Sequence, residues 1–203
     1  MRISVITAVL VLAAGSVHAQ EGTDVQAAAR AYEEGQLAQL QNDYARAARF
    51  FEIAHRAAPA APAIRSAIRN HREAGALPRA ATLSLIAAAS YADDAETSEL
   101  TERVLAEANT TLGRLDVACA EPCSLSVDGH LVTLANVEEF SVFVLPGSHT
   151  LIARFSTGEQ SSSFDLAAGA TMTRSLDAPV VEATPDDTVT PPALSIVEPD
   201  PIT

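Results

Sequence analysis

The spacing of apolar residues changes once along this chain of 203 residues, near Gly113, and this change limits the possible folds more than any other feature. Before Gly113, apolar residues recur every three or four positions, as on one face of an amphipathic helix. The capping box Thr23–Gln26 predicts where the first helix starts. After Gly113, Leu115, Val117 and Cys119 occupy every second position, which is the period of a half-buried strand. The sequence therefore predicts the α+β class, with a helical module first and an all-β module second.

The first 19 residues carry the three parts of a secretory signal. Arg2 precedes an apolar run over residues 3–14, and small residues occupy the −1 and −3 positions of a cut before Gln20. An uncleaved membrane anchor is the alternative, but about a dozen apolar residues are fewer than the ~20 that span a bilayer. We therefore expect residues 1–19 to be removed and the mature chain to be periplasmic or secreted, with no transmembrane segment.

The chain has two cysteines, Cys119 and Cys123, and export places them in an oxidising compartment, where a disulfide is favoured. The connection between them contains Pro122 and can bring the two Cα atoms within bridging range. The alternatives are free thiols, a redox dithiol, which usually has the C-x-x-C spacing, and a metal pair, which needs four ligands. Only His130 and His149 lie nearby, without ligand spacing. We expect a structural disulfide that closes a turn between two strands.

Small and large residues follow one another in a fixed order over residues 35–59. They are Gly35, Ala38, Tyr44, Ala47, Phe51, Ala54 and Pro59. This order resembles the tetratricopeptide repeat, in which small residues lie where two helices touch, although Ala31 stands where that family prefers an aromatic residue. A weaker copy follows 33 residues later, and a helix over residues 95–112 would cap the stack. The resemblance implies a helical repeat module over residues 20–112 that binds segments of other proteins.

The same resemblance places a ligand groove on the concave face of the helical module. Its residues, carried over by the 33-residue register, are Tyr32, Gln36, Gln39, Arg65, Arg69 and Arg72. The three arginines have i, i+4 and i+7 spacing and form one stripe, whose guanidinium groups suit carboxylates. We therefore expect an acidic peptide segment of a protein partner in this groove. The alternative is a solvated face on which the arginines pair with Glu73 or Glu33.

Residues 113–177 contain regularly spaced turn signals between short apolar runs, which indicate about six strands in a small β-sandwich. Three pieces of this region resemble the PEGA domain of bacterial surface proteins: Ser126–Gly129, Leu145–Leu151 and Ala168–Thr171. Residues 120–123 stand in place of the tetrapeptide that names the family. The resemblance implies a structural or adhesive module of the cell envelope. His149 follows Pro146-Gly147 closely and could be a catalyst, but its place at the start of a strand leads us to expect a structural role.

The formal net charge is −13, and most acidic residues lie after Ala80. A generally acidic surface repels nucleic acid and anionic lipid, so we expect neither as a partner. Residues 178–203 combine prolines and acids with no arginine, which is the composition of a disordered tail. This tail could be a flexible spacer or a solvated segment without a role of its own. A third alternative is that it docks on the stripe formed by Arg65, Arg69 and Arg72.

An enzyme needs a convergent set of nucleophile, base or metal ligands, and no such set is recognisable in the sequence. The five histidines are scattered along the chain, and the Gly-x-Ser-x-Gly, His-Glu-x-x-His and phosphate-loop motifs are missing. We expect no cofactor, no metal and no catalysis. We therefore interpret the chain as a protein–protein interaction scaffold or adaptor of the cell envelope that acts through its tetratricopeptide-like module.

The alternative function is the binding of peptidoglycan or another surface glycan by the β module. Glycan sites usually expose aromatic rings on which a sugar stacks. The aromatic residues of the β module are Phe140, Phe143, Phe155 and Phe164, with no Tyr or Trp among them. This composition argues against the glycan hypothesis.

Overall fold

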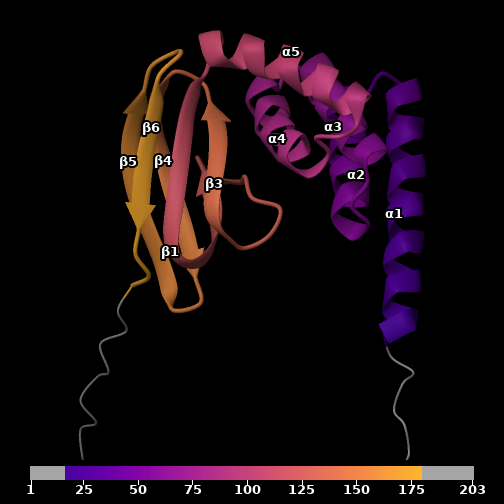
Figure 1. Cartoon of the computed structure of the whole chain (residues 1–203), viewed down its shortest axis with the longest axis horizontal. Coiled ribbons are helices and arrows are strands. Elements are labelled where there is room, and N and C mark those ends of the chain that lie inside the picture. Colours follow the sequence, from indigo (N-terminus) through magenta and orange to yellow (C-terminus); the bar gives the residue numbers. More distant parts are fainter. Residues whose placement is uncertain (1–16, 180–203) are drawn as a thin grey trace, which may run out of the picture.

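The computed structural model describes residues 17–179, with side chains from Asp24 onward. The predicted signal segment, 1–19, lies outside the described residues except for 17–19, and the predicted tail lies outside them from residue 180. The chain forms five helices and then six strands, which confirms the α+β class with the helical part first. Figure 1 shows α1 to α4 stacked beside one another, with α5 leading over to the β part. Within residues 17–179, every helix is too short or too polar to span a bilayer.

The helical part consists of α1 (Val17–Leu40), α2 (Tyr44–Ala57), α3 (Ala61–Glu73), α4 (Leu77–Ser90) and α5 (Ala95–Thr111). Connections of three residues follow α1, α2 and α3, and connections this short make neighbouring helices antiparallel. Pro62 and Pro78 lie in the first turns of α3 and α4, where the missing N–H interrupts no helical hydrogen bond. Asp43 and Asp94 cap α2 and α5, because each carboxylate accepts from the backbone N–H three residues later.

The first helix starts earlier than the sequence predicts. The capping box Thr23–Gln26 predicts a start at Thr23, but α1 is already helical from Val17, so this prediction is wrong. No proline lies between Val17 and Thr23, and nothing in the backbone there stops a helix. The predicted cut before Gln20 therefore falls in the first turn of α1.

Small residues set the distance between the helices. Ala47, Ala67 and Ala80 are fully buried, and Gly35 on α1 faces the ring of Phe51 on α2. A methyl group added at Gly35 would lie 2.8 Å from that ring, closer than van der Waals contact allows. The helices therefore pack at short distances, and Phe51 fills the space between α1 and α2.

The β part consists of β1 (Gly113–Val127), β2 (His130–Leu131), β3 (Val137–Val144), β4 (Gly147–Phe155), β5 (Gly158–Leu166) and β6 (Thr171–Leu176). The first half of β1 pairs antiparallel with β3 and parallel with β6. Its second half pairs antiparallel with β2 and β4, and β4 pairs antiparallel with β5. Strand β1 thus belongs to two layers of strands, and both layers contribute to one core that includes Leu115, Leu125 and Leu151.

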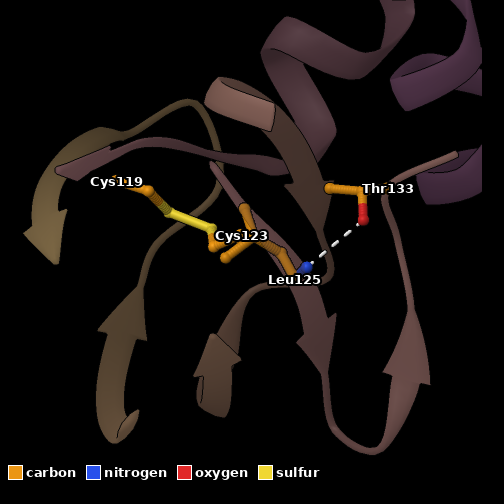
Figure 2. Close-up of a disulfide and its surroundings, with 4 residues drawn as sticks. All are labelled: Cys119, Cys123, Leu125 and Thr133. Carbon is orange, nitrogen blue, oxygen red and sulfur yellow. Dashed lines mark hydrogen bonds between the residues drawn. A yellow bond between two sulfur atoms is a disulfide. The ribbon is translucent and has the colours of Figure 1, made fainter. Parts of the chain in front are cut away.

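The Sγ atoms of Cys119 and Cys123 lie 2.06 Å apart, the distance of the predicted disulfide (Figure 2). The expected turn between two separate strands is wrong, because both cysteines lie in β1. Pairing with β3 passes from Ala118 opposite Glu139 directly to Cys123 opposite Val137, so the residues between the cysteines bulge out of the ladder. The two halves of β1 pair with different strands and not with each other. The disulfide therefore closes the bulge at which β1 changes layers.

A hydrogen bond near the disulfide holds the loop that precedes β3. The backbone N–H of Leu125 donates to Oγ1 of Thr133 over 3.2 Å, and this donor and acceptor are both buried (Figure 2). The backbone N–H of Val132 donates to the carbonyl oxygen of Leu125. These bonds fix the loop after β2 against the second half of β1.

Helix α4 packs on β3 and joins the helical part to the β part. The backbone N–H of Phe143 donates to Oγ1 of Thr82 over 3.0 Å, and the hydroxyl of Thr82 donates to the carbonyl oxygen of Pro78. The side chain of Phe143 is buried in the core of the helical part, although its strand belongs to the β part. The two parts therefore share a buried contact and are not separated by a linker.

Candidate binding cleft

The arginine stripe predicted from the sequence faces α5. Arg65 binds Asp94 at 2.8 Å and Glu96 at 2.9 Å, and its side chain is largely buried. Arg69 also binds Glu96, at 2.6 Å, and Arg72 binds Glu107 at 3.0 Å. The nearby acids proposed as local partners, Glu73 and Glu33, take no part in these pairs. The stripe is occupied by carboxylates of its own chain.

The other three predicted groove residues do not gather around the arginines. Tyr32 packs edge-on against Phe51, with ring centroids 5.0 Å apart, and is partly buried in the helical core. Gln36 is exposed on α1. The side-chain oxygen of Gln39 accepts a long hydrogen bond, 3.4 Å, from the amide of Asn70 on α3. Tyr32 thus packs beside α3, the helix that carries the stripe, and Gln39 hydrogen-bonds to it, but neither faces the three arginines' carboxylate partners on α5.

A cleft of about 510 Å³ lies instead between the helices and the β part. One wall comes from α2, the end of α3 and the start of α4, and it carries charged residues. The other wall comes from the end of β1, from β2 and β3, and from the turn before β4. This second wall is mainly apolar and includes Leu131, Val142 and Leu145. Leu131 and Leu145 lie together on this wall and expose 54% and 60% of their surface.

Glu52 is the centre of a buried charged cluster in the helical wall. Nε2 of His71 lies 2.6 Å from one carboxylate oxygen, and Nε of Arg79 donates to the same oxygen over 3.0 Å. Burial by itself would raise the pKa of Glu52, but the hydrogen bonds and charges of His71 and Arg79 outweigh burial and bring the pKa to about 2. Glu52 is therefore ionised at any physiological pH, and both of its carboxylate oxygens are bound by His71 and Arg79.

Arg79 also contacts the opposite wall of the cleft. Its Nη1 donates to the carbonyl oxygen of Val132 over 2.6 Å, while Nη2 holds the second carboxylate oxygen of Glu52. Arg79 therefore binds both walls and fixes their separation.

Two further arginines line the cleft without such partners. Arg49 and Arg56 are exposed on α2, on the same side as Glu52. Neither forms an ion pair with any residue of the described chain, 24–179. A separation of seven residues on a helix corresponds to about 10 Å. The cleft thus offers two unneutralised cations beside an apolar wall.

The apolar wall is shaped by a clamp between two turns. Nδ1 of His149 lies 2.6 Å from a carboxylate oxygen of Asp128, and Nε2 lies 2.6 Å from the carbonyl oxygen of Leu145. The other carboxylate oxygen of Asp128 accepts from the backbone N–H of Thr150. Asp128 and Gly129 both have positive φ, as a tight hairpin turn requires. The clamp holds the exposed Leu145 in place at the cleft.

The clamp favours a charged imidazole. Burial lowers the pKa of His149, but the acceptors Asp128 and Leu145 outweigh burial, and the net result is a raised pKa. Burial would raise the pKa of Asp128, but the hydrogen bond from His149 lowers it, and the net shift is downward. Both ring nitrogens of His149 face acceptors, so only the imidazolium form, which carries a proton on each nitrogen, can donate a hydrogen bond to both.

The acid–base groups along the cleft walls have hydrogen-bond partners within the protein. Glu52, His71, Asp128 and His149 are held by side-chain or backbone partners of the protein itself, and Nδ1 of the exposed His130 lies 3.0 Å from the carbonyl oxygen of Asp128. Among the described residues, no group of three or more His, Cys, Asp or Glu side chains could hold a metal ion. Compared with known proteins, this chain matches no family model and no curated protein.

This cleft was not predicted from the sequence. The spacing of Arg49, Glu52 and Arg56, at i, i+3 and i+7, forms a stripe on α2 like the one predicted on α3, and this signal was present in the sequence. The contact between Arg79 and Val132 joins residues 53 positions apart, and no sequence pattern indicates it.

Proposed function

We propose that this chain is a non-catalytic adaptor of the bacterial cell envelope that binds a segment of a partner protein in the cleft between its helical and β parts. The observation that carries the proposal is the pairing of an apolar wall with two arginines, Arg49 and Arg56, that have no ion-pair partner in the described chain. The export signal and the tetratricopeptide-like and PEGA-like patterns support the location and the class. The site differs from the groove predicted on α3.

The charges explain why the cleft is a better site than the stripe on α3. An acidic segment that approaches Arg65 would have to displace Asp94 and Glu96, which already lie within 3 Å of its guanidinium. An acidic segment that approaches Arg49 or Arg56 displaces no carboxylate. Charge-assisted hydrogen bonds to a new carboxylate are therefore gained in full at Arg49 and Arg56 but not at the stripe on α3.

The geometry of the cleft favours an extended peptide. Specific ligand sites combine an apolar surface with a few polar groups that fix orientation. Here Leu131 and Leu145 supply exposed apolar surface, and the two arginines supply orientation. A peptide with alternating apolar residues and at least one carboxylate can contact the exposed leucines and bind the arginines at the same time.

The glycan alternative gains no support from the β part. Phe143, Phe155 and Phe164 are buried, and Phe140 is half-buried against the core. A sugar ring needs an exposed aromatic face for stacking, and the described β part offers none.

Site-specific photocross-linking in intact cells tests the proposal. The photoreactive residue p-benzoylphenylalanine replaces Leu131 or Leu145 in the cleft, or Leu40 on α1, which is also exposed and lies outside the cleft. Because all three side chains face solvent, the substitutions leave the core intact. The proposal predicts a discrete adduct with a second protein from Leu131 and Leu145 but not from Leu40. An adduct from Leu40 alone, or no adduct from either cleft position, contradicts it.

A further inference from the structure

We infer that the cleft is occupied by the chain's own C-terminal segment, residues 193–200, when no partner is bound. This inference rests on the cleft being the binding site proposed above. The ligand of the cleft would then be an extended peptide segment that presents apolar side chains and carboxylates on one face. A partner of the same chemistry would then bind by displacing this segment.

Residues 193–200 combine large apolar side chains with two carboxylates. Residues 180–203 contain five acidic residues and no basic ones. Ala193–Glu198 is the longest stretch without proline after Pro192, and it contains Leu194, Ile196 and Val197. Such apolar and β-branched residues favour an extended backbone and gain free energy when they are buried. A tail that served only as a solvated spacer would not need them.

The alternation of side chains matches the cleft. In an extended chain, residues at every second position share one face, so Leu194, Ile196 and Glu198 point the same way, followed by Asp200. Two apolar side chains can lie on the wall formed by β2 and β3, and the carboxylates of Glu198 and Asp200 then lie about 7 Å apart. This spacing is within reach of two long arginine side chains whose backbones are about 10 Å apart on α2.

The tail is long enough to reach the cleft. A side chain added at Gly158 would touch the ring of Pro179, so the chain leaves the described structure beside the turn between β4 and β5. The cleft includes His149, near the other end of β4, and the nine residues of β4 span about 30 Å. Residues 180–193 can extend over about 46 Å, at roughly 3.3 Å per residue. The required path is therefore shorter than the reach.

Tethering makes weak contacts sufficient. A tether of this length gives an effective concentration in the millimolar range, so the segment needs only modest affinity to occupy the cleft. The stripe on α3, one of the alternatives considered for the tail, is less suitable because Arg65, Arg69 and Arg72 are already paired with α5. The cleft is where the unneutralised positive charge and the apolar surface coincide.

Tryptophan fluorescence of the full chain tests the inference, because the natural sequence contains no Trp. In one variant Ile196→Trp, and in a second Leu194→Trp, the single indole reports whether the segment is buried. The inference predicts blue-shifted emission and reduced acrylamide quenching compared with the same substitution in a free peptide of residues 180–203. The shift should be independent of protein concentration, because docking is intramolecular, and Thr188→Trp should stay fully quenchable.

The arginines provide the specificity control. Replacing Arg49 and Arg56 together by Gln should return the emission of Trp at 196 or 194 to the free-peptide value, and so should high salt. Replacing Arg30 and Arg174 by Gln, which are also exposed and unpaired among the described residues, should change nothing. Emission at the free-peptide value in both tryptophan variants overturns the inference. A blue shift that survives Arg49→Gln with Arg56→Gln, or appears only at high protein concentration, also overturns it.

This experiment is independent of the cross-linking experiment. If the indole is exposed but Leu131 and Leu145 still form an adduct with a partner, the adaptor function stands and the docking of the tail fails. If the indole is buried in an arginine-dependent manner and no partner is captured, the docking of the tail stands and the adaptor function fails.

Discussion

The guanidinium of Arg79 lies 2.6 Å from the carbonyl oxygen of Val132, and this hydrogen bond joins the helical part to the loop before β3. The same guanidinium binds the buried carboxylate of Glu52. One side chain therefore stabilises the charged cluster in the helices and the separation of the cleft walls. The two roles can be separated by substitution.

Replacing Arg79 by Met should lower the free energy of unfolding by about 3–5 kcal/mol, because the buried carboxylate of Glu52 loses its guanidinium partner and keeps only the contact with His71. The double variant Arg79→Met with Glu52→Gln should recover part of this loss, since the buried charge is gone. Urea unfolding at neutral pH, followed by far-ultraviolet circular dichroism, measures both. If Arg79→Met alone is as stable as the natural protein, the cluster does not hold the fold together.

Stability should fall in acid because of Glu52. Its pKa is about 2 in the folded protein, against 4.5 for an unperturbed glutamate, so the folded state prefers the ionised form. The resulting stabilisation is fully present above pH 4.5 and is lost as the pH falls towards 2, with a maximum of about 3 kcal/mol. Glu52→Gln should flatten this part of the stability profile. An unchanged profile in Glu52→Gln would mean that other carboxylates cause the acid unfolding.

His149 should produce the opposite dependence on pH. Its pKa in the folded protein lies above the ordinary 6.5, so the imidazolium stabilises the fold. That stabilisation is complete below pH 6.5 and is lost as the pH rises through the folded pKa. Thermal unfolding between pH 6 and 9 should show a decline that His149→Gln removes, and the ring protons of His149 should titrate above 6.5 by NMR. A titration below 6.5 would rule out the clamp as described.

The disulfide should contribute moderately to stability. The closed loop of Cys119 and Cys123 is short, and the chain-entropy relation gives about 2 kcal/mol for a loop of this size. Replacing both cysteines by Ala avoids leaving a polar group in the buried position of Cys123 and should lower the unfolding free energy by about that amount without preventing folding. In the natural protein, neither thiol should react with an alkylating reagent until a reductant is added. Rapid alkylation without reductant would exclude the bond.

Local patterns in the sequence predicted most elements of the fold. The change of period near Gly113 separated helices from strands, because both periods arise from burial of one face. Residues 95–112 were expected as a helix, and α5 spans Ala95–Thr111. The pairing of Cys119 with Cys123 followed from their number and spacing. The resemblances to tetratricopeptide repeats and to PEGA domains remain predictions.

The features that were missed depend on which residues meet across the fold. The sequence could not show that the first half of β1 pairs with β3 and the second half with β4. Because of this pairing, the segment around Pro122 is a bulge within one strand and not the expected turn between two strands. The stripe beginning at Arg65 was correctly placed on one face of a helix, but its partners Asp94 and Glu96 lie beyond the next helix. Charge counts reveal an excess of acids without telling which acid meets which arginine.

The yield of the cross-link at Leu131 in two double-arginine variants shows whether the cleft or the groove on α3 binds the partner. In cells that carry p-benzoylphenylalanine in place of Leu131, one variant has Arg49→Gln with Arg56→Gln, and its matched control has Arg69→Gln with Arg72→Gln. If the cleft binds an acidic segment of a partner, the first pair should abolish the adduct and the second should leave its yield unchanged. Loss of the adduct only in Arg69→Gln with Arg72→Gln would contradict the account and return the binding site to the groove on α3.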